Sequence, residues 1–143
     1  MSALIHNLFI KPAHGEPMRA VESVRAEGGR GLAGDASYGR SKRQVLIIER
    51  ETLRRFQLQP GQVRENMVIG GLALAGVPAG TQIQAGDALL EVTGDCDPCR
   101  FLDDIRGGLQ SDMEGRRGTL CRVLSGGDIR IGDAVRIVSA DSA

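Results

Sequence analysis

The sequence has no tryptophan and only four other aromatic residues, which are Phe9, Tyr38, Phe56 and Phe101. The core must therefore be built from leucine, isoleucine, valine and alanine. The three cysteines are an odd number, which argues against the disulfide framework of a small secreted protein.

An excess of either charge is also missing, because Lys+Arg and Asp+Glu both number 18. No net field attracts nucleic acid or an anionic membrane surface, so we expect neither as a partner. The sequence lacks a long apolar run and a basic leader, which predicts no signal peptide, no transmembrane span and a cytoplasmic location. Only two lysines stand against sixteen arginines, which leaves few candidates for a Schiff base to pyridoxal phosphate.

Glycine is abundant, with 20 residues, and it separates many short apolar segments. The segments predicted as strands are 3–10, 18–26, 44–48, 118–124, 129–131 and 134–138, with a short strand after the polar triplet 64–66 and short strands around the Gly-Asp pair in 82–92. The segments predicted as short helices are 49–57, 98–106 and 109–114. Because no alternating βαβ pattern runs through the chain, we expect a mainly β fold, a distorted β-barrel, in a single domain over residues 1–143.

Two stretches of the chain resemble one another, 82–92 and 128–138. Each carries an isoleucine, two further residues, Gly-Asp-Ala and then an apolar strand. The Gly-Asp pair is typical of a tight turn between short strands. We therefore expect a hairpin in each stretch, and we expect 129–131 to pair with 118–124.

A glycine-rich stretch covers residues 28–35 and continues as a basic segment to Arg43. Glycine next to basic residues is one way to cradle a phosphate, but the spacing matches neither the P-loop nor the Rossmann fingerprint. As an isolated motif the stretch predicts an exposed loop.

Two of the three cysteines lie in the segment Cys96-Asp97-Pro98-Cys99, where local signals predict the start of a helix. We expect Gly94 to end the preceding strand, Asp97 to cap the helix and Pro98 to take its first position. Cys99 would then lie in the first turn, where free backbone amides and the helix dipole favour a thiolate. The sequence therefore predicts a reactive thiol at Cys99.

Other roles for these cysteines have less support. Both can be small apolar core residues, as cysteine often is. A closed zinc site needs four ligands, and Cys121 is single while the two histidines lie far away in sequence. A thioredoxin-type dithiol would use Cys96 and Cys99, but that motif needs a βαβ setting, which the predicted β-rich fold does not supply.

The order of several short motifs resembles the MOSC domain family, named for the C-terminal domain of molybdenum cofactor sulfurase. The matching features, over a core of about residues 18–138, are 31–35 (Gly-Leu-Ala-Gly-Asp), 44–47 (Gln-Val-Leu-Ile), 64–66 (Arg-Glu-Asn), 98–99 (Pro-Cys) and 118–138 with its Gly-Asp turn. The resemblance implies a distorted β-barrel with one characteristic cysteine, which corresponds to Cys99.

In members of that family that bind the molybdenum cofactor, this cysteine is the metal ligand, and another proposal makes it a persulfide-holding sulfur carrier. The resemblance therefore implies molybdenum cofactor (molybdopterin) binding, with Cys99 as metal ligand and catalytic residue. It also implies a set of cofactor-binding residues, which are Arg64, Asn66, Arg100, Arg122 and Asp35, with Arg116 and Arg117 as further candidates. Arginine suits the pterin phosphate because its planar fork binds oxyanions through two hydrogen bonds.

Three functions stay open at this point. The resemblance favours a reductase, or reductase component, that acts on N-hydroxylated compounds; whether the chain is itself an oxidoreductase stays open. The second function is a sulfur carrier or cofactor-handling module with a persulfide on Cys99, and the third is a Cys96–Cys99 dithiol redox protein. Since no flavin, nicotinamide or iron–sulfur motif is present, a reductase would need an external electron donor, and a carrier would need a sulfur donor protein.

Overall fold

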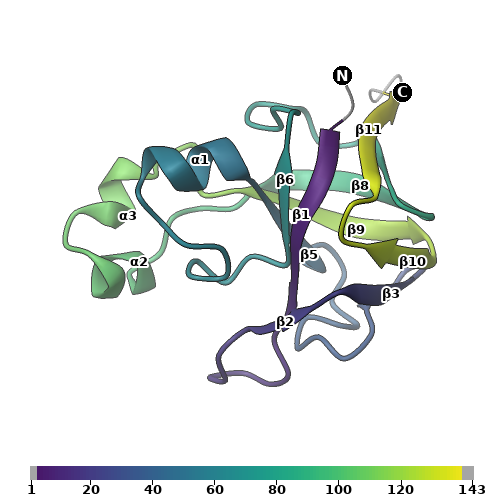
Figure 1. Ribbon diagram of the computed structural model, residues 1–143, viewed down its shortest axis with the longest axis horizontal. Coiled ribbons are helices and arrows are strands. Elements are labelled where there is room, and N and C mark those ends of the chain that lie inside the picture. Colours follow the sequence, from purple (N-terminus) through teal and green to yellow (C-terminus); the bar gives the residue numbers. More distant parts are fainter. Residues whose placement is uncertain (1–2, 140–143) are drawn as a thin grey trace.

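The computed structural model describes residues 3–139 and shows a closed, seven-stranded mixed β-barrel with three short helices (Figure 1). The strands are β1 (Ala3–Ile10), β2 (Arg19–Val21), β3 (Ser23–Glu27), β4 (Gly31–Leu32), β5 (Val45–Glu49), β6 (Met67–Gly70), β7 (Gln82–Ala85), β8 (Ala88–Asp95), β9 (Thr119–Ser125), β10 (Gly127–Arg130) and β11 (Ala134–Ser139). The helices are α1 (Arg50–Arg55), α2 (Phe101–Ile105) and α3 (Leu109–Asp112), which together make 11% of the fold. The predicted fold class is confirmed.

The barrel follows the strand order β11-β7-β8-β9-β5-β6-β1, and β1 pairs with β11 to close the ring. The closing register places Ala3 opposite Val135 and Leu4 opposite Ala134. Within the ring only β5 and β6 are parallel. β2 pairs with the far end of β1, and β10, β3 and β4 form a second, small sheet. Closure of the ring leaves its strands without open edges.

The barrel interior is aliphatic, as the scarcity of aromatic residues requires. Alternate residues of the strands point inward, and Ile5, Ile47, Met67 and Leu90 are all essentially inaccessible to solvent. β5 is buried along its whole length rather than on one face. Its continuous apolar run has a simple cause, because on its outer face the helices cover Ile48, and Leu46 packs with Cys96 and Leu120.

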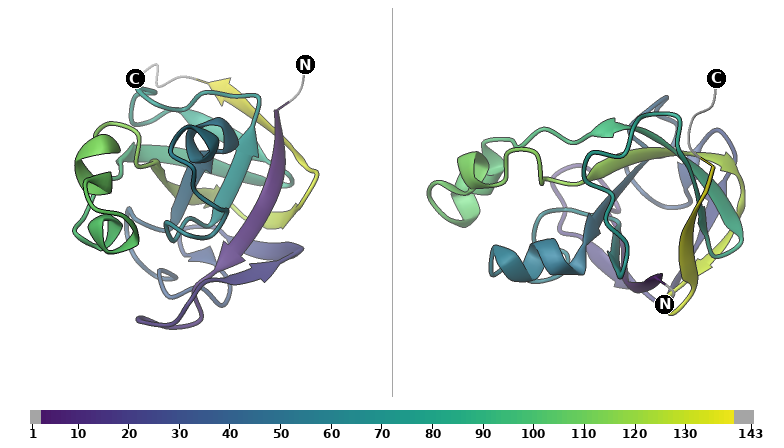
Figure 2. Two further views of the ribbon diagram at one scale, coloured as in Figure 1. Left: turned by 60° about the vertical axis from the view of Figure 1, so that its left-hand side comes forward. Right: turned by 90° about the horizontal axis from the view of Figure 1, so that it is seen from above.

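The three helices lie together on one side of the barrel (Figure 2). They form a second apolar cluster, in which Leu53 of α1, Leu102 of α2 and Leu109 of α3 pack with Ile48 and Val68 from the outer faces of β5 and β6. This cluster attaches the helical side to the barrel and so positions the segments that connect the two.

No helix within residues 3–139 is long and apolar enough to cross a membrane.

Several local predictions are confirmed and others are wrong. β1 has the predicted bounds, and β7 and β8 form the predicted hairpin around Gly86 and Asp87. The second Gly-Asp turn, at Gly132-Asp133, does not join a hairpin. β10 pairs with β3 instead of β9, and β11 pairs with β7 and β1. The turn moves the chain from the small sheet to the barrel, and the backbone N–H of Gly132 bonds the carbonyl of Ile5 on β1.

The predicted strand 18–26 is two strands in the structure, since β2 and β3 belong to different sheets. The chain changes sheets at Glu22, whose carbonyl accepts a hydrogen bond from the backbone N–H of Ile131. The sequence after Val138 predicts a frayed tail at 139–143; Ser139 is the last residue of β11, and residues 140–143 lie outside the described residues.

Candidate functional site

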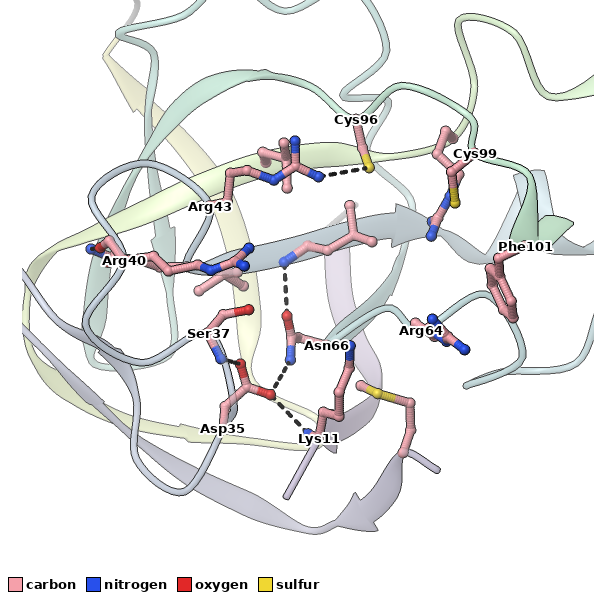
Figure 3. A pocket seen from close by; sticks show the side chains of 16 residues that line it. Lys11, Asp35, Ser37, Arg40, Arg43, Arg64, Asn66, Cys96, Cys99 and Phe101 are labelled. Carbon is pink, nitrogen blue, oxygen red and sulfur yellow. Dashed lines mark hydrogen bonds between the residues drawn. The ribbon is translucent and has the colours of Figure 1, made fainter. Parts of the chain in front are cut away.

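A cleft of about 170 Å³ opens beside β5, between the segment that follows β8 and the loop that joins β4 to β5. Figure 3 shows Cys96 and Cys99 on one side of this cleft and Asp35, Asn66 and Lys11 on the other. The structure therefore brings together three separate motifs from the sequence: the cysteine segment, the Arg64–Asn66 triplet and the loop that contains Asp35.

The cysteine segment differs from its prediction. β8 continues through Gly94 to Asp95, with a register shift against β9, and α2 begins only at Phe101. The N-cap residue is Arg100, no side chain caps the helix, and residues 96–99 have no regular secondary structure. The cause is the anchoring of Cys96, whose N–H bonds the carbonyl of Gly118 and so keeps the chain beside β9 beyond the expected break.

Cys99 therefore lies before the helix rather than in its first turn, and the helix dipole no longer supports a thiolate there. Cys96 and Cys99 therefore do not open a helix, as the two cysteines of a thioredoxin-type dithiol would. The reactivity of Cys99 must come from its exposure and from the charges around the cleft.

The three cysteines have different environments. Cys121 is fully buried in the barrel, and burial raises the pKa of its thiol to about 12. Burial also raises the pKa of Cys96, while the nearby Arg117 and Arg43 oppose that rise. Cys99 is exposed, and its sulfur makes no hydrogen bond to any residue in the range 3–139. Cys99 is thus the accessible thiol of the cleft.

Positive side chains surround this thiol. Five cationic residues line the cleft, and they are Lys11, Arg40, Arg43, Arg64 and Arg117. The lining contains one carboxylate, that of Asp35. The ion pairs of the described part of the chain lie elsewhere, in Arg25–Asp128, Arg130–Asp128 and Arg122–Glu91. The cleft is therefore electropositive, although the whole chain carries no net charge.

Hydrogen bonding within the described residues leaves most of these cations free. Lys11, Arg40 and Arg64 make no side-chain hydrogen bond there, and Arg43 Nη2 lies 4.0 Å from Cys96 Sγ (Figure 3). Groups of this kind are suited to bind an anion that enters the cleft.

Arg117 differs because its guanidinium is buried, with 4% of the residue exposed. Its Nη2 donates to the carbonyl of Val63 at 2.6 Å, and its Nε and Nη1 have no partner in the described residues. Glu65 is also buried; burial raises the pKa of its carboxyl, an effect that the N–H of Gly61 and then Arg117 oppose. Arg117 thus adds positive potential to the cleft from below its surface.

Asp35 and Asn66 form the rigid wall of the cleft. The carboxylate of Asp35 accepts from the backbone N–H groups of Lys11 at 2.8 Å and Ser37 at 3.0 Å, and from Asn66 Nδ2 at 3.2 Å (Figure 3). Asn66 also donates to the carbonyl of Phe9 and accepts from the N–H of Leu46. Both amide hydrogens of Asn66 are used within the protein, so these two residues hold the segments that carry the cations.

Arg64 has an unusual backbone and an aromatic partner. Its φ is +64°, in the left-handed region that residues other than glycine seldom adopt. Its Cζ lies 3.9 Å from the centre of the Phe101 ring, at the start of α2 (Figure 3). The stack joins the Arg64–Asn66 triplet to the segment that carries Cys99.

The structure separates the predicted site residues into two groups. Cys99, Arg64, Asn66, Asp35 and Arg117 line the cleft. The other three predicted site residues do not line the cleft, and they are Arg100, Arg116 and Arg122. Arg122 is an ion-pair partner of Glu91 on the outside of β8 and β9, at 2.6 Å, and Arg116 lies beside a separate small cavity near Glu49.

Sequence reasoning did not assign four of the lining residues to a site: Lys11, Arg40, Arg43 and Phe101. Arg40 and Arg43 come from the basic continuation of the glycine-rich stretch, which was expected to be an exposed loop. The basic composition of this stretch was the signal that could have pointed to an anion site. The sequence does not show which residues lie beside the stretch in the folded protein. No group of three His, Cys, Asp or Glu side chains within residues 3–139 is arranged to hold a metal ion.

Comparison with solved structures shows a shared fold. YuaD protein from Bacillus subtilis matches with a TM-score of 0.82 and 20% identity, over 94% of each chain. YiiM from Escherichia coli matches with a TM-score of 0.76 and 22% identity, over 100% of this chain and 72% of the other. YiiM from Geobacillus stearothermophilus matches with a TM-score of 0.78 and 20% identity, over 96% of this chain and 75% of the other.

Comparison with protein-family models assigns the chain to a family, which the solved structures at 20–22% identity do not do alone. Among proteins with curated functions, no match to the chain was found. The MOSC domain model matches residues 13–136, which includes every residue of the cleft except Lys11. This family is associated in general with binding of the molybdenum cofactor. The chain belongs to the MOSC domain family.

Proposed function

We propose that this protein binds the molybdenum cofactor in the cleft, with the Cys99 thiolate as metal ligand. The observation that carries the proposal is the set of five cations around one accessible thiol, with the single carboxylate of the lining already hydrogen-bonded. A cleft of this kind favours a ligand that is anionic and that also offers a soft metal centre to sulfur.

The residues of the cleft fit the chemical groups of the cofactor. Its pterin carries a phosphate, and Lys11, Arg40, Arg43 and Arg64 have free donors for oxyanions. The exposed sulfur of Cys99 is a soft ligand, which suits molybdenum. Asp35 and Asn66 would hold the cations in place rather than contact the cofactor, since their polar atoms bond within the protein.

When bound, the cofactor supplies two-electron redox chemistry at the metal. We propose that the activity is the reduction of N-hydroxylated compounds and that a separate donor protein provides the electrons. In this proposal the chain itself binds the cofactor, orients the metal through Cys99, and balances the negative charge of the ligand with its arginines.

A second candidate rests on the exposure of Cys99. A persulfide on this sulfur would be an accessible anion beside the same cations, which is the arrangement that a sulfur carrier needs. Peptide mass analysis distinguishes the two candidates, because in a carrier the peptide that contains Cys99 gains the mass of one sulfur atom.

The test is cofactor retention in matched charge variants. Protein from a cofactor-competent host is purified, and its released pterin is measured by fluorescence after oxidation. We expect wild type and Arg122→Gln to retain similar pterin, because Arg122 pairs with Glu91 outside the cleft. The double variant Arg40→Gln/Arg43→Gln should lose about a hundredfold in affinity, since it removes two charged hydrogen bonds that each contribute about 1.5 kcal/mol. Equal retention in all three proteins would contradict the proposal.

A further inference from the structure

Phe101 and Arg64 form a direct side-chain contact between the Arg64–Asn66 triplet and the start of α2, two residues after Cys99. The guanidinium carbon of Arg64 lies 3.9 Å from the centre of the Phe101 ring. The guanidinium makes no other side-chain bond within residues 3–139, and both residues line the cleft. A ring against one guanidinium face leaves the N–H edges free to bind an anion.

The backbone of Arg64 is held from both sides. Its N–H bonds the carbonyl of Gly61 at 3.2 Å, which closes a turn with φ +64° at Arg64. Two residues later, Asn66 is fixed by its five bonds to Phe9, Leu46 and Asp35. A left-handed residue other than glycine persists only where its surroundings determine it, and such residues are concentrated at functional sites. Arg64 is therefore a pre-positioned side chain.

The Cys99 segment, in contrast, has few restraints. Cys96 N–H bonds Gly118, and the carbonyl of Cys99 accepts from the N–H of Leu102 at 3.0 Å. Within residues 96–99 the remaining bonds are long, such as Gln110 Nε2 to the carbonyl of Pro98 at 3.4 Å. Phe101 lies two residues after Cys99 and packs against the apolar cluster under the helices. The packing of Phe101 therefore restrains the chain two residues from the thiol.

We propose that Phe101 is a positioning residue of the cleft, whose ring holds the Arg64 guanidinium and so couples anion binding at Arg64 to the placement of the Cys99 thiol. The proposal rests on the proposed function in one respect, which is that the cleft binds an anion. Phe101 itself acts through Arg64 and the Cys99 segment and need not touch the ligand.

The coupling is measured on the apoprotein as the rate of Cys99 alkylation by iodoacetamide, a neutral reagent, with and without inorganic phosphate at constant ionic strength. A phosphate bound by the Arg64 guanidinium should fix the Phe101 stack and, through it, the position of the Cys99 sulfur, so we expect phosphate to slow wild-type alkylation at least about threefold. In Phe101→Leu the ratio of the two rates should fall to about one. Phe101→Tyr keeps an aromatic face and should restore the wild-type ratio.

The chain offers a matched control in its second arginine–phenylalanine contact, where Arg55 Cζ lies 5.7 Å from the Phe56 ring, outside the cleft. Phe56→Leu should keep the wild-type phosphate effect. Should Phe101→Leu fail to fold, Arg64→Lys replaces it, because lysine keeps the charge but lacks the planar face, and it should also lose the effect.

The outcomes separate the two proposals. A phosphate effect in wild type that persists in Phe101→Leu and in Arg64→Lys would overturn the coupling and leave the anion-binding cleft standing. No phosphate effect in wild type would overturn the coupling and also contradict the electropositive cleft on which the proposed function depends. Loss of the effect in Phe56→Leu as well would show a general loss of rigidity and would overturn the specific role of Phe101.

Discussion

Asn66 and Asp35 use their polar atoms inside the protein, whereas Lys11, Arg40 and Arg64 have free side-chain donors within the described residues. This division gives Arg64 a different duty from Asn66 and Asp35, although the family resemblance had grouped these three as cofactor-binding residues. The first two build a wall, and the others present charge to a ligand. An uncompensated cluster of cations repels itself unless a ligand neutralises it, which is why we regard the cleft as an anion site.

The three thiols should differ sharply in reactivity. Cys99 is exposed, Cys96 is 7% exposed, and Cys121 is inaccessible with a pKa of about 12. Native alkylation followed by peptide mass analysis should therefore label Cys99 roughly tenfold or more faster than Cys96, and should label Cys121 only after denaturant is added. Equal labelling of Cys99 and Cys121 in the native protein would contradict the burial that we describe.

Glu65 should make stability depend on pH. Burial raises the pKa of this carboxyl in the folded protein, so the folded chain keeps its proton over a range in which the unfolded chain releases it. The stabilising contribution is complete below the unfolded pKa, about 4.3 for glutamate, and is lost as the pH rises through the higher folded-state pKa. We expect Glu65→Gln to remove this loss, because an amide oxygen can still accept the N–H of Gly61.

The measurement is urea unfolding of wild type and Glu65→Gln between about pH 4 and about pH 8. The free energy of unfolding of wild type should fall relative to the variant as the pH rises. Glu114→Gln, at an exposed position, should run parallel to wild type. A variant that instead becomes less stable than wild type at high pH would show that Glu65 is ionised and paired with Arg117.

At the scale of elements, equal sequence patterns lead to different structures. Gly86 and Gly132 lie in similar Gly-Asp turns, yet the first joins a hairpin and the second connects two sheets. The local sequence predicts a turn in both places, but the partner of the following strand depends on contacts far away in the chain. The cysteine helix shows the same limit, since the bond between Cys96 and Gly118 moved its start to Phe101.

The hairpin turn gives a direct stability test. Gly86 has φ +55°, and an added Cβ there would collide with the carboxylate of Asp133 and lie 3.0 Å from the carbonyl of Asp128. We expect Gly86→Ala to reduce the free energy of unfolding by about 2 kcal/mol, from backbone strain and crowding together. Gly107→Ala is the control, because open space surrounds that position and its φ is not left-handed. Equal melting temperatures of the two variants would contradict this account of the turn.

At the scale of the whole molecule, the barrel was predictable and its cleft was predictable only in part. Short apolar runs, glycine turns and the family motifs are local signals, and they indicated the mainly β fold and brought Cys99, Arg64 and Asn66 into one hypothesis. Lys11, Arg43 and Phe101 lie at distant points of the chain, and closure of the barrel with its helical side brings them together. Sequence periodicity carries no record of such contacts.

The central claim also concerns the whole molecule, and it is that the cleft holds the molybdenum cofactor through Cys99. The most direct test is elemental analysis of molybdenum in protein purified from a cofactor-competent host, as wild type, Cys99→Ser and Cys96→Ser. Cys99 is exposed, so its substitution should leave the fold intact. The account predicts nearly one molybdenum per chain in wild type and Cys96→Ser and a large loss in Cys99→Ser. Equal molybdenum in wild type and Cys99→Ser, or none in wild type from a host shown to load other molybdenum proteins, would contradict it.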